Sequence, residues 1–365
     1  MPTLFDPIRL GAIEAPNRII MAPLTRGRAT RAHVPTPIMA EYYAQRADAG
    51  LIISEATGIS QQGLGWPYAP GLWSDEQVEA WRPVVKAVHD AGGRFFAQLW
   101  HMGRVVHPSF LNGEQPVSAS ATTAPDHAHT YDGKQPYAEA RALREDEIPG
   151  LLEDYRRAAR NALKAGFDGV QIHAANGYLI DQFLRDNANL RTDGYGGGIE
   201  NRTRLLREVT QAVVDTVGAD RTAVRLSPNG AIQGVDDSNA PALFVAAATV
   251  LSKLGIAFLE MREPIPEGTF GKPSTPPVAP AIRKVFANPL ILNSDYDLAR
   301  AEADVASGLA DAIAFGRPFI ANPDLVTRLK TRASLNKDVA KTWYSQGPEG
   351  YVDYPALGGD AVAAQ

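Results

Sequence analysis

The sequence contains no cysteine among its 365 residues. This absence excludes disulfide bridges, zinc sites built from thiolates, iron–sulfur clusters and cysteine nucleophiles. The absence of cysteine is compatible with a reducing cytosol. It limits the reactions that the protein can perform more than it indicates the compartment in which the protein works.

Long hydrophobic runs and an excess of positive charge are also missing. The longest apolar run, residues 242–251, is too short to span a bilayer. Residues 1–7 lack the basic region and apolar stretch of a secretory signal. A formal net charge of −5 provides no basic face for a phosphate backbone. We therefore expect a soluble, cytoplasmic protein with no membrane or nucleic-acid partner.

The chain does contain enough apolar residues, 45% of the total, to bury a large core. Short apolar runs of strand character recur along it, at 18–21, 51–54, 95–99, 169–172, 223–226, 256–259, 290–292 and 312–315. Segments with helical periodicity lie between or after them, at 41–49, 75–91, 147–165, 201–217, 241–254, 298–307 and 322–329. Glycines that suit a helix C-terminus precede several of the strands.

This alternation of strands and helices predicts the α/β class and a parallel sheet. The repeat of eight predicts a closed (β/α)8 TIM barrel in one domain, residues 1–365. A doubly wound open sheet is the alternative.

The regular spacing is interrupted once, by residues 102–144 after the third strand. An insertion there hangs from the C-terminal face of a barrel, where active sites lie, so we expect a lid or pocket wall. Its composition also fits a disordered surface loop. Residues 341–357 are rich in aromatic side chains and are expected to pack back on the barrel.

One turn stands out chemically. His173, Asn176 and Tyr178 follow directly after the apolar run 167–172, so an imidazole, a carboxamide and a phenol emerge at the end of one strand. The first two can donate hydrogen bonds to one oxygen, and the phenol can supply a proton nearby. The alternative is an ordinary turn whose polar groups satisfy the local backbone.

In a barrel, side chains at the other strand ends converge on the same face. This set comprises Thr25, Ala56, Gln98, His173, Asn176, Arg225, Asn293, Gly316 and Arg317. It has neither the ligands of a metal shell nor a nucleophile triad, but it can surround a planar, hydrogen-bonding, phosphorylated ligand. Flavin mononucleotide (FMN) fits that description. Gly316 and Arg317 would supply backbone N–H groups and a guanidinium to its phosphate.

Five motifs in the same order resemble those of the old yellow enzyme family of flavin-dependent ene-reductases. They are Met21-Ala-Pro-Leu-Thr25, Gln98-Leu-Trp-His-Met-Gly-Arg104, His173-Ala-Ala-Asn-Gly-Tyr-Leu179, Glu200-Asn-Arg202 and Gly316-Arg-Pro-Phe-Ile-Ala-Asn-Pro-Asp324. The resemblance runs nearly from end to end. It implies a (β/α)8 barrel that holds FMN tightly without a covalent bond, and a transient hydride donor, NADPH or NADH.

The resemblance also implies roles toward the flavin. Pro23 and Thr25 contact it, and Thr25 hydrogen-bonds the carbonyl near its reactive nitrogen. Ala56 and Gln98 touch the pyrimidine edge. Arg225 faces the N1/O2 region, where a cation stabilises the reduced anionic flavin.

For the substrate, the resemblance implies that His173 and Asn176 hold a carbonyl or nitro oxygen. The β-carbon of a conjugated alkene then accepts hydride, and Tyr178 protonates the α-carbon in a ping-pong cycle. Trp100 and Tyr344 line the pocket. The expected substrates are α,β-unsaturated carbonyl compounds, maleimides and nitro compounds.

The sequence departs from the family pattern near the seventh strand. Where the family often has glycine, this chain has Asn293-Ser294-Asp295. Phosphate contacts are expected there from the backbone N–H groups of Ser294 or Asp295, with the Asp295 carboxylate turned away. Thr25 places the chain with the threonine-bearing subgroup rather than with the members that have cysteine.

Two aromatic residues in glycine-flanked loops, Trp66 and Phe270, are further candidates for the pocket lining. The basic run 25–31 fits either the phosphate of NADPH or a solvated loop. The histidines of the insertion lack the spacing of metal ligands, so no metal is expected.

Two other function classes remain open at this stage. One is a flavin-free barrel lyase or isomerase that acts on a phosphorylated substrate, with His173 as the base. The other is a flavin-binding protein without catalytic activity. The sequence does not indicate the physiological substrate, the preferred nicotinamide or the oligomeric state.

Overall fold

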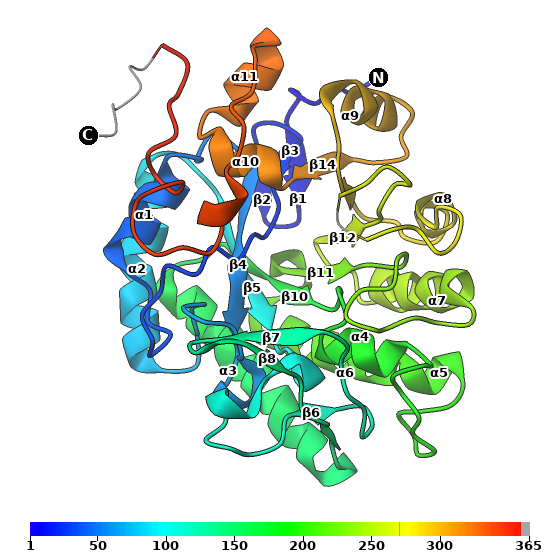
Figure 1. Cartoon of the computed structure of the whole chain (residues 1–365). Helices are drawn as coiled ribbons and strands as arrows, with labels where there is room; N and C mark the ends of the chain where they lie inside the picture. Colours follow the sequence, from blue (N-terminus) through cyan, green and yellow to red (C-terminus); the bar gives the residue numbers. More distant parts are fainter. Residues whose placement is uncertain (270, 359–365) are drawn as a thin grey trace.

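Short parallel strands pair side by side and close into an eight-stranded barrel in this computed structural model, which describes residues 1–269 and 271–358 (Figure 1). Around the barrel the strands are β3 (Ile19–Met21), β4 (Leu51–Gly58), β5 (Phe95–Trp100), β10 (Gly169–His173), β11 (Thr222–Leu226), β12 (Phe258–Arg262), β13 (Leu290–Asn293) and β14 (Ala312–Phe315). Because β14 pairs with β3, the sheet has no open edge. The prediction of a (β/α)8 barrel is confirmed, and the open doubly wound alternative is wrong.

Helices surround the barrel (Figure 1). The main ones are α1 (Pro37–Ala44), α2 (Asp75–Asp90), α3 (Ile148–Ala165), α6 (Arg204–Val217), α7 (Ala240–Lys253), α8 (Ala279–Arg283), α9 (Leu298–Ala306) and α11 (Leu325–Thr331). The sequence did not predict α8 or three further short helices, α4 (Leu179–Leu184), α5 (Ile199–Arg202) and α10 (Arg317–Ala321).

The first helix lies earlier in the chain than its predicted range of 41–49. It begins at Pro37, whose fixed φ and missing N–H suit the first helical position. It ends at Ala44, because the chain then changes to tighter turns in which Arg46 donates its N–H to the carbonyl of Tyr43. The apolar residues after this point are therefore buried in turns rather than on a helix.

A small antiparallel hairpin closes the base of the barrel. It consists of β1 (Ile8–Leu10) and β2 (Ile13–Ala15). Its Leu10 and Ala15 are buried in the barrel interior against a set that includes Phe96 and Phe258. Gly11 occupies the turn with a φ of +60°, and a Cβ there would lie 2.0 Å from the carbonyl oxygen of Asp220. The site must therefore lie at the opposite end, beyond the C-terminal ends of the strands.

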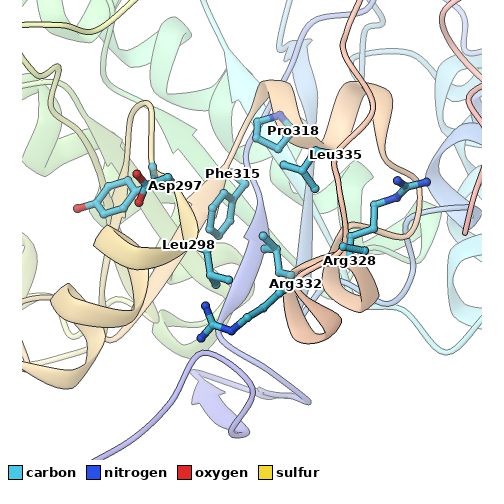
Figure 2. A pocket seen from close by; sticks show the side chains of 10 residues that line it. Asp297, Leu298, Phe315, Pro318, Arg328, Arg332 and Leu335 are labelled. Carbon is cyan, nitrogen blue, oxygen red and sulfur yellow. The ribbon is translucent and has the colours of Figure 1, made fainter.

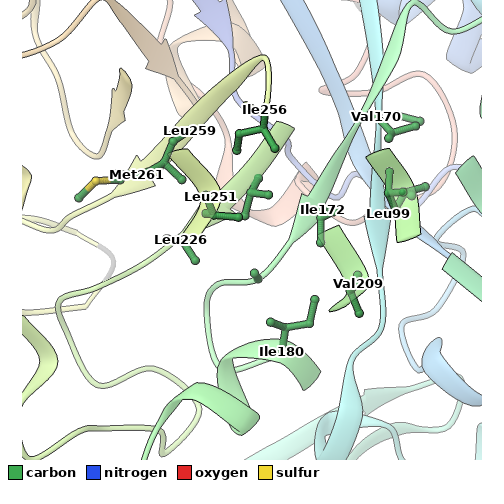
Figure 3. Close-up of a cluster of buried hydrophobic side chains, with 14 of the residues drawn as sticks. Leu99, Val170, Ile172, Ile180, Val209, Leu226, Leu251, Ile256, Leu259 and Met261 are labelled. Atoms are coloured by element: carbon green, nitrogen blue, oxygen red, sulfur yellow. The ribbon is translucent and has the colours of Figure 1, made fainter. Parts of the chain in front are cut away.

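Side chains alternate between the inside of the barrel and the layer under the helices. Leu259 and Met261 of β12 point outward into the apolar layer that also contains Ile172 of β10 and Val209 of α6 (Figure 3). Because neighbouring residues of a strand face opposite sides, Glu260 between them faces the interior. This alternation places polar side chains inside the barrel.

The insertion at 102–144 has its own secondary structure. It contains the 3₁₀ turns Gly103–Val105 and Pro108–Phe110 and the strands β6 (Val117–Ser118), β7 (His127–Thr130), β8 (Gly133–Pro136) and β9 (Arg141–Ala142). Strands β7 and β8 form a hairpin, and β6 pairs with β9. Apolar side chains of the segment are buried in a cluster with Trp100, which Tyr178 also contacts. The insertion is therefore packed, not a free surface loop.

The aromatic segment near the C-terminus packs on the barrel as predicted. The ring of Tyr351 stacks on that of Tyr42 with centroids 4.0 Å apart. The guanidinium of Arg26 donates to the carbonyl oxygens of Trp343 and Gly350. Within the described residues, no helix has the length and apolar character needed to cross a membrane.

Candidate active site

A series of hydrogen-bonded polar side chains crosses the interior of the barrel below its mouth. Gln98 of β5 donates from Nε2 to Oε1 of Gln171 of β10, at 2.7 Å. Gln171 in turn donates from Nε2 to Oε2 of Glu260 of β12, at 2.6 Å. All three side chains are buried. Each amide is therefore fixed in one orientation by its neighbour, because the donor of one must meet the acceptor of the next.

This series of polar side chains continues through Arg225 and Asn293. Nε of Arg225, on β11, lies 3.3 Å from Oε1 of Glu260, although the angle falls short of a hydrogen bond. Its Nη2 donates to Oδ1 of Asn293 at 2.7 Å, and Asn293 donates from Nδ2 to the carbonyl of Ala314 at 2.7 Å. The guanidinium is thus positioned by residues from two neighbouring strands.

The predicted catalytic turn brings two of its three side chains into contact. The rings of His173 and Tyr178 meet edge to face with centroids 4.9 Å apart. Between them, Asn176 and Gly177 have positive φ values of 58° and 76°. A Cβ on Gly177 would lie 2.7 Å from the carbonyl oxygen of Ile232, so the turn requires glycine there.

The amide of Asn176 is oriented by a neighbour that the sequence did not indicate. Nη1 of Arg262, the last residue of β12, donates to its Oδ1 at 3.4 Å. The backbone of Asn176 is also held, because the N–H of Asn176 donates to Oγ of Ser227 and its carbonyl oxygen accepts from Nε2 of Gln233. With Oδ1 occupied, the NH2 group of Asn176 is the part of the amide left to bind an acceptor.

The protonation states fit a hydrogen-bonding site for an oxygen. Burial, and then the charge of Arg225, lower the pKa of His173 well below its usual value, so the imidazole is neutral. Burial raises the pKa of Tyr178 above its usual value, so the phenol keeps its proton at neutral pH. Both groups can therefore donate hydrogen bonds without carrying a net charge.

The loop after β3 is fixed relative to β4 by one buried carboxylate. Glu55 accepts hydrogen bonds from the backbone N–H groups of Arg26 and Gly27, each at 3.2 Å. The residues next to these groups, Thr25 and Ala56, are two predicted flavin contacts, and Ala56 is in register with Gln98. Pro23 lies buried in the same loop.

The predicted phosphate clamp holds an unexpected carboxylate. Asp295 accepts a hydrogen bond of 2.6 Å from Nη2 of Arg317, and Thr269 donates its hydroxyl to the same carboxylate. The expectation that this carboxylate turns away is therefore wrong. Backbone geometry explains it, because Ser294 and Asp295 have positive φ values of 128° and 47°, which bring the side chain toward Gly316-Arg317.

Aromatic residues from distant parts of the chain form a rim, here defined as Trp66, His129 and Tyr344. The ring of Trp66 lies 4.7 Å from that of His129 in the insertion and 5.1 Å from that of Tyr344 near the C-terminus. Tyr344 is about half exposed. Trp100, deeper in the site, contacts Tyr178 at 5.0 Å. The remaining candidate, Phe270, lies outside the described residues.

Within the basic run 25–31, Arg26 and Arg28 are neither solvated nor free to meet a phosphate, whereas Arg31 is exposed. Arg26 and Arg28 are almost wholly buried, and Arg28 donates to the carbonyls of Thr342 and Trp343. The run therefore fixes the segment that carries Tyr344.

An apolar cavity of about 230 Å³ lies outside the barrel, between β14, α9 and α11 (Figure 2). Phe315 and Pro318, which line it, flank the Gly316-Arg317 pair. It is separate from the mouth, where the polar residues converge. No group of three or more potential metal ligands occurs in the part of the chain that the structure describes.

The structure also places residues beside the candidate site that the sequence did not single out, namely Gln171, Asp181, Gln233, Glu260 and Arg262. The sequence did contain one signal for them: several of these residues are charged or amide residues within otherwise apolar strands and helices. Asp181, for example, lies in the buried α4, where it accepts from the N–H of Gly177.

Comparison with known proteins shows the family to which the chain belongs. Residues 3–336 match the model of the NADH:flavin oxidoreductase / NADH oxidase family. The chain is 67% identical to the solved old yellow enzyme homologue of Zymomonas mobilis, with 97% of this chain and 99% of that chain covered and a TM-score of 0.96. The chain belongs to the old yellow enzyme family.

Other relatives agree with this assignment. Morphinone reductase is 45% identical, with 98% and 96% of the two chains covered and a TM-score of 0.94. The 12-oxophytodienoate reductase 1 of Oryza sativa subsp. japonica is 44% identical over 97% of this chain and 93% of its own length. This old yellow enzyme is an FMN-dependent oxidoreductase that uses NAD(P)H, so the flavin-free lyase or isomerase alternative is wrong.

The donor set of the mouth fits FMN. Nδ1 of His173 is buried and has no hydrogen-bond partner within the described residues, and Arg225, its neighbour in register, is an almost completely buried cation. Buried donors of this kind are costly unless a ligand satisfies them. Oxygen and nitrogen acceptors on a planar ring system meet this requirement.

Proposed function

We propose that this old yellow enzyme is an ene-reductase, which reduces the activated C=C bond of α,β-unsaturated carbonyl compounds, maleimides or nitro compounds. The observation that supports it most directly is the convergence of His173, Asn176 and Tyr178 on one turn at the barrel mouth. FMN, when bound, supplies the hydride that it receives from NADPH or NADH. The residues of the chain bind, polarise and protonate.

For the isoalloxazine ring of FMN, we assign contacts to residues on four strands or the loops after them. Pro23 and Thr25 lie in the loop that Glu55 fixes, and Thr25 donates to the flavin carbonyl near the reactive nitrogen. Ala56 and Gln98 contact the pyrimidine edge. Arg225 faces the N1/O2 region, where its charge favours the reduced flavin.

For the phosphate of FMN, we assign the backbone N–H groups of Ser294, Asp295 and Gly316 together with the guanidinium of Arg317. The contacts of Arg317 with Asp295 and Thr269 both use Nη2. A guanidinium has five N–H donors, so Nε and Nη1 are the groups that reach a phosphate.

The substrate oxygen binds to His173 and the NH2 group of Asn176. Neutral donors suit this role, since they withdraw electron density from the conjugated system and stabilise the charge that develops on the oxygen. Tyr178, which is protonated at neutral pH, then transfers its proton to the α-carbon.

The insertion 102–144 closes one side of the pocket within a single domain of residues 1–365. Its packing around Trp100 and the contact of His129 with Trp66 support this role. Trp66, Trp100 and Tyr344 form the walls. Phe270 remains a candidate for the lining from sequence alone. The relatives named as morphinone and 12-oxophytodienoate reductases support reduction of an organic substrate.

The visible spectrum of the purified protein under anaerobic conditions tests this proposal. The flavin absorption should bleach when NADPH is added and return when 2-cyclohexenone follows. A flavin that bleaches but is not reoxidised by the enone, by a maleimide or by a nitroalkene would overturn ene-reduction.

A further inference from the structure

Glu260 is a buried carboxylate that the proposed catalytic cycle does not use. It lies on β12 and is fully buried inside the barrel. Gln171 donates to its Oε2 at 2.6 Å, while its Oε1 faces Nε of Arg225 at 3.3 Å. Burial of a carboxylate costs free energy unless a neighbouring opposite charge or hydrogen bonds stabilise it.

The neighbouring charge is the guanidinium assigned to the flavin. Arg225 is itself almost completely buried, so little water screens the attraction between the two groups. Asn293 holds the other side of the guanidinium through Nη2. The positive charge that Arg225 presents to the mouth is therefore offset by a negative charge directly behind it.

Flavin reduction is the step that responds to this balance of charge. Hydride transfer from NAD(P)H delivers two electrons and one proton to FMN and produces NAD(P)+. The flavin thereby gains one negative charge. A cation beside its N1/O2 region favours this change, and an anion close to that cation opposes it.

We propose that Glu260 sets the reduction potential of the bound flavin by partly neutralising Arg225. This inference rests on the proposed placement of Arg225 beside the pyrimidine end of FMN. The carboxylate keeps the potential lower than Arg225 alone would make it. The reduced flavin is consequently a stronger hydride donor toward the alkene.

Substitution Glu260→Gln removes the charge and keeps a side chain of the same size. Its amide oxygen can still accept from Gln171, so the polar chain across the barrel is retained. Reduction gives the flavin one negative charge, so removing the unit charge of Glu260 changes the equilibrium between oxidised and reduced flavin by about tenfold or more. For the two-electron flavin couple, a tenfold change corresponds to a rise in potential of about 30 mV.

The experiment measures the midpoint potential of the FMN-loaded protein by equilibration with a reference dye. A second readout is the affinity for sulfite, which adds to oxidised flavin and leaves negative charge in the same region. Glu260→Gln should raise the potential and tighten sulfite binding about tenfold. Glu260→Ala, which removes the same charge without an amide, should change both in the same direction.

Glu263→Gln is the matched control. Glu263 is also a buried carboxylate near β12, but it accepts from the backbone N–H groups of Val278 and Ala279 rather than from Arg225. Its substitution should leave the potential unchanged. A potential that rises equally in this control would show a general effect of buried charge and would overturn the role of Glu260.

Arg225→Gln separates the inference from the placement on which it rests. If the placement is correct, this substitution lowers the potential. A lowered potential in Arg225→Gln with no rise in either Glu260 variant overturns the inference and leaves the placement intact. No change in any of these variants overturns the placement of Arg225 as well.

Discussion

The phenol ring of Tyr178 stands edge-on to the imidazole of His173, with the ring planes at 81°. Both residues belong to one turn, and Trp100 packs against the same phenol at 84°. The proposed proton donor and the group proposed to bind the substrate oxygen are therefore held in a fixed relation by packing. Their separate roles can be tested by separate kinetic measurements.

Substitution Tyr178→Phe should slow alkene reduction and leave flavin reduction by NADPH nearly unchanged. Only the second half-reaction needs a proton on the α-carbon, and general acid catalysis contributes about 10²–10⁴-fold. Stopped-flow spectroscopy measures the two half-reactions separately. Equal loss of rate in both would contradict the assignment, because the phenol would then be needed for flavin or nicotinamide binding.

Substitution Asp295→Asn should tighten FMN binding about tenfold, since a unit charge near the phosphate is removed. The asparagine oxygen can still accept from Arg317 and Thr269, so the position of the guanidinium is retained. Fluorescence quenching gives the dissociation constants of FMN and riboflavin for the apoprotein. Riboflavin lacks the phosphate and is the control. A similar change for both ligands would refute an effect on the phosphate.

Stability should fall as the pH decreases below about 6.5, the usual pKa of an unfolded histidine. Burial lowers the pKa of His101 to about 3 and that of His173 well below its usual value, so both are neutral in the folded protein. The unfolded chain binds more protons in this range, and each histidine contributes up to about 1.4 kcal/mol per pH unit.

Urea unfolding between pH 5 and 7.5 measures this dependence. Asp48 acts in the opposite direction, because burial raises its pKa to about 6 and the folded state then binds more protons. The variant His101→Asn isolates one contribution: its Oδ1 can accept from the N–H of Gly103 as the imidazole does. A slope identical to that of the parent protein would contradict the prediction.

Substitution Arg28→Lys should raise KM for the enone more than it changes the rate of flavin reduction. Arg28 donates to the carbonyls of Thr342 and Trp343 and to Oγ of Ser345, and it lies over the ring of Tyr351. A lysine cannot make this fork of hydrogen bonds.

The stability cost of Arg28→Lys should be about 2–4 kcal/mol, because buried acceptors lose their donors. Steady-state kinetics and limited proteolysis of the segment after residue 340 measure the two effects. Arg31→Lys is the control, since Arg31 is exposed and lies over Tyr131 of the insertion. An unchanged KM in Arg28→Lys would show that the segment carrying Tyr344 does not need this anchor.

The sequence was sufficient to predict the barrel, because short apolar runs and glycine stops recur with the period of a strand and a helix. It was less informative where a strand carries charge. The sixth strand was predicted at 256–259, but β12 spans Phe258–Arg262. Glu260 and Arg262 interrupt the apolar run in the sequence, yet they alternate with Leu259 and Met261 and simply face the interior.

Local sequence patterns could not predict contacts between residues that are far apart in the chain. The basic character of Arg26 and Arg28 suggests solvent or a phosphate, but their partners are carbonyls more than 300 positions away. The contact of Asp295 with Arg317 depends on unusual backbone angles at Ser294 and Asp295, which a non-glycine residue rarely adopts. Only the folded chain shows which charges meet.

The polar chain from Gln98 to Asn293 is carried by barrel strands, whereas the rim of Trp66, His129 and Tyr344 is carried by loops and a terminal segment. Strands of a closed barrel tolerate few changes, while loops diverge readily. The proposed roles of rim and strand interior therefore imply that new substrates can be acquired during evolution by exchanging loops, without altering the electrochemistry of the flavin. Directed evolution for new substrates should start at the rim and leave the strand interior untouched.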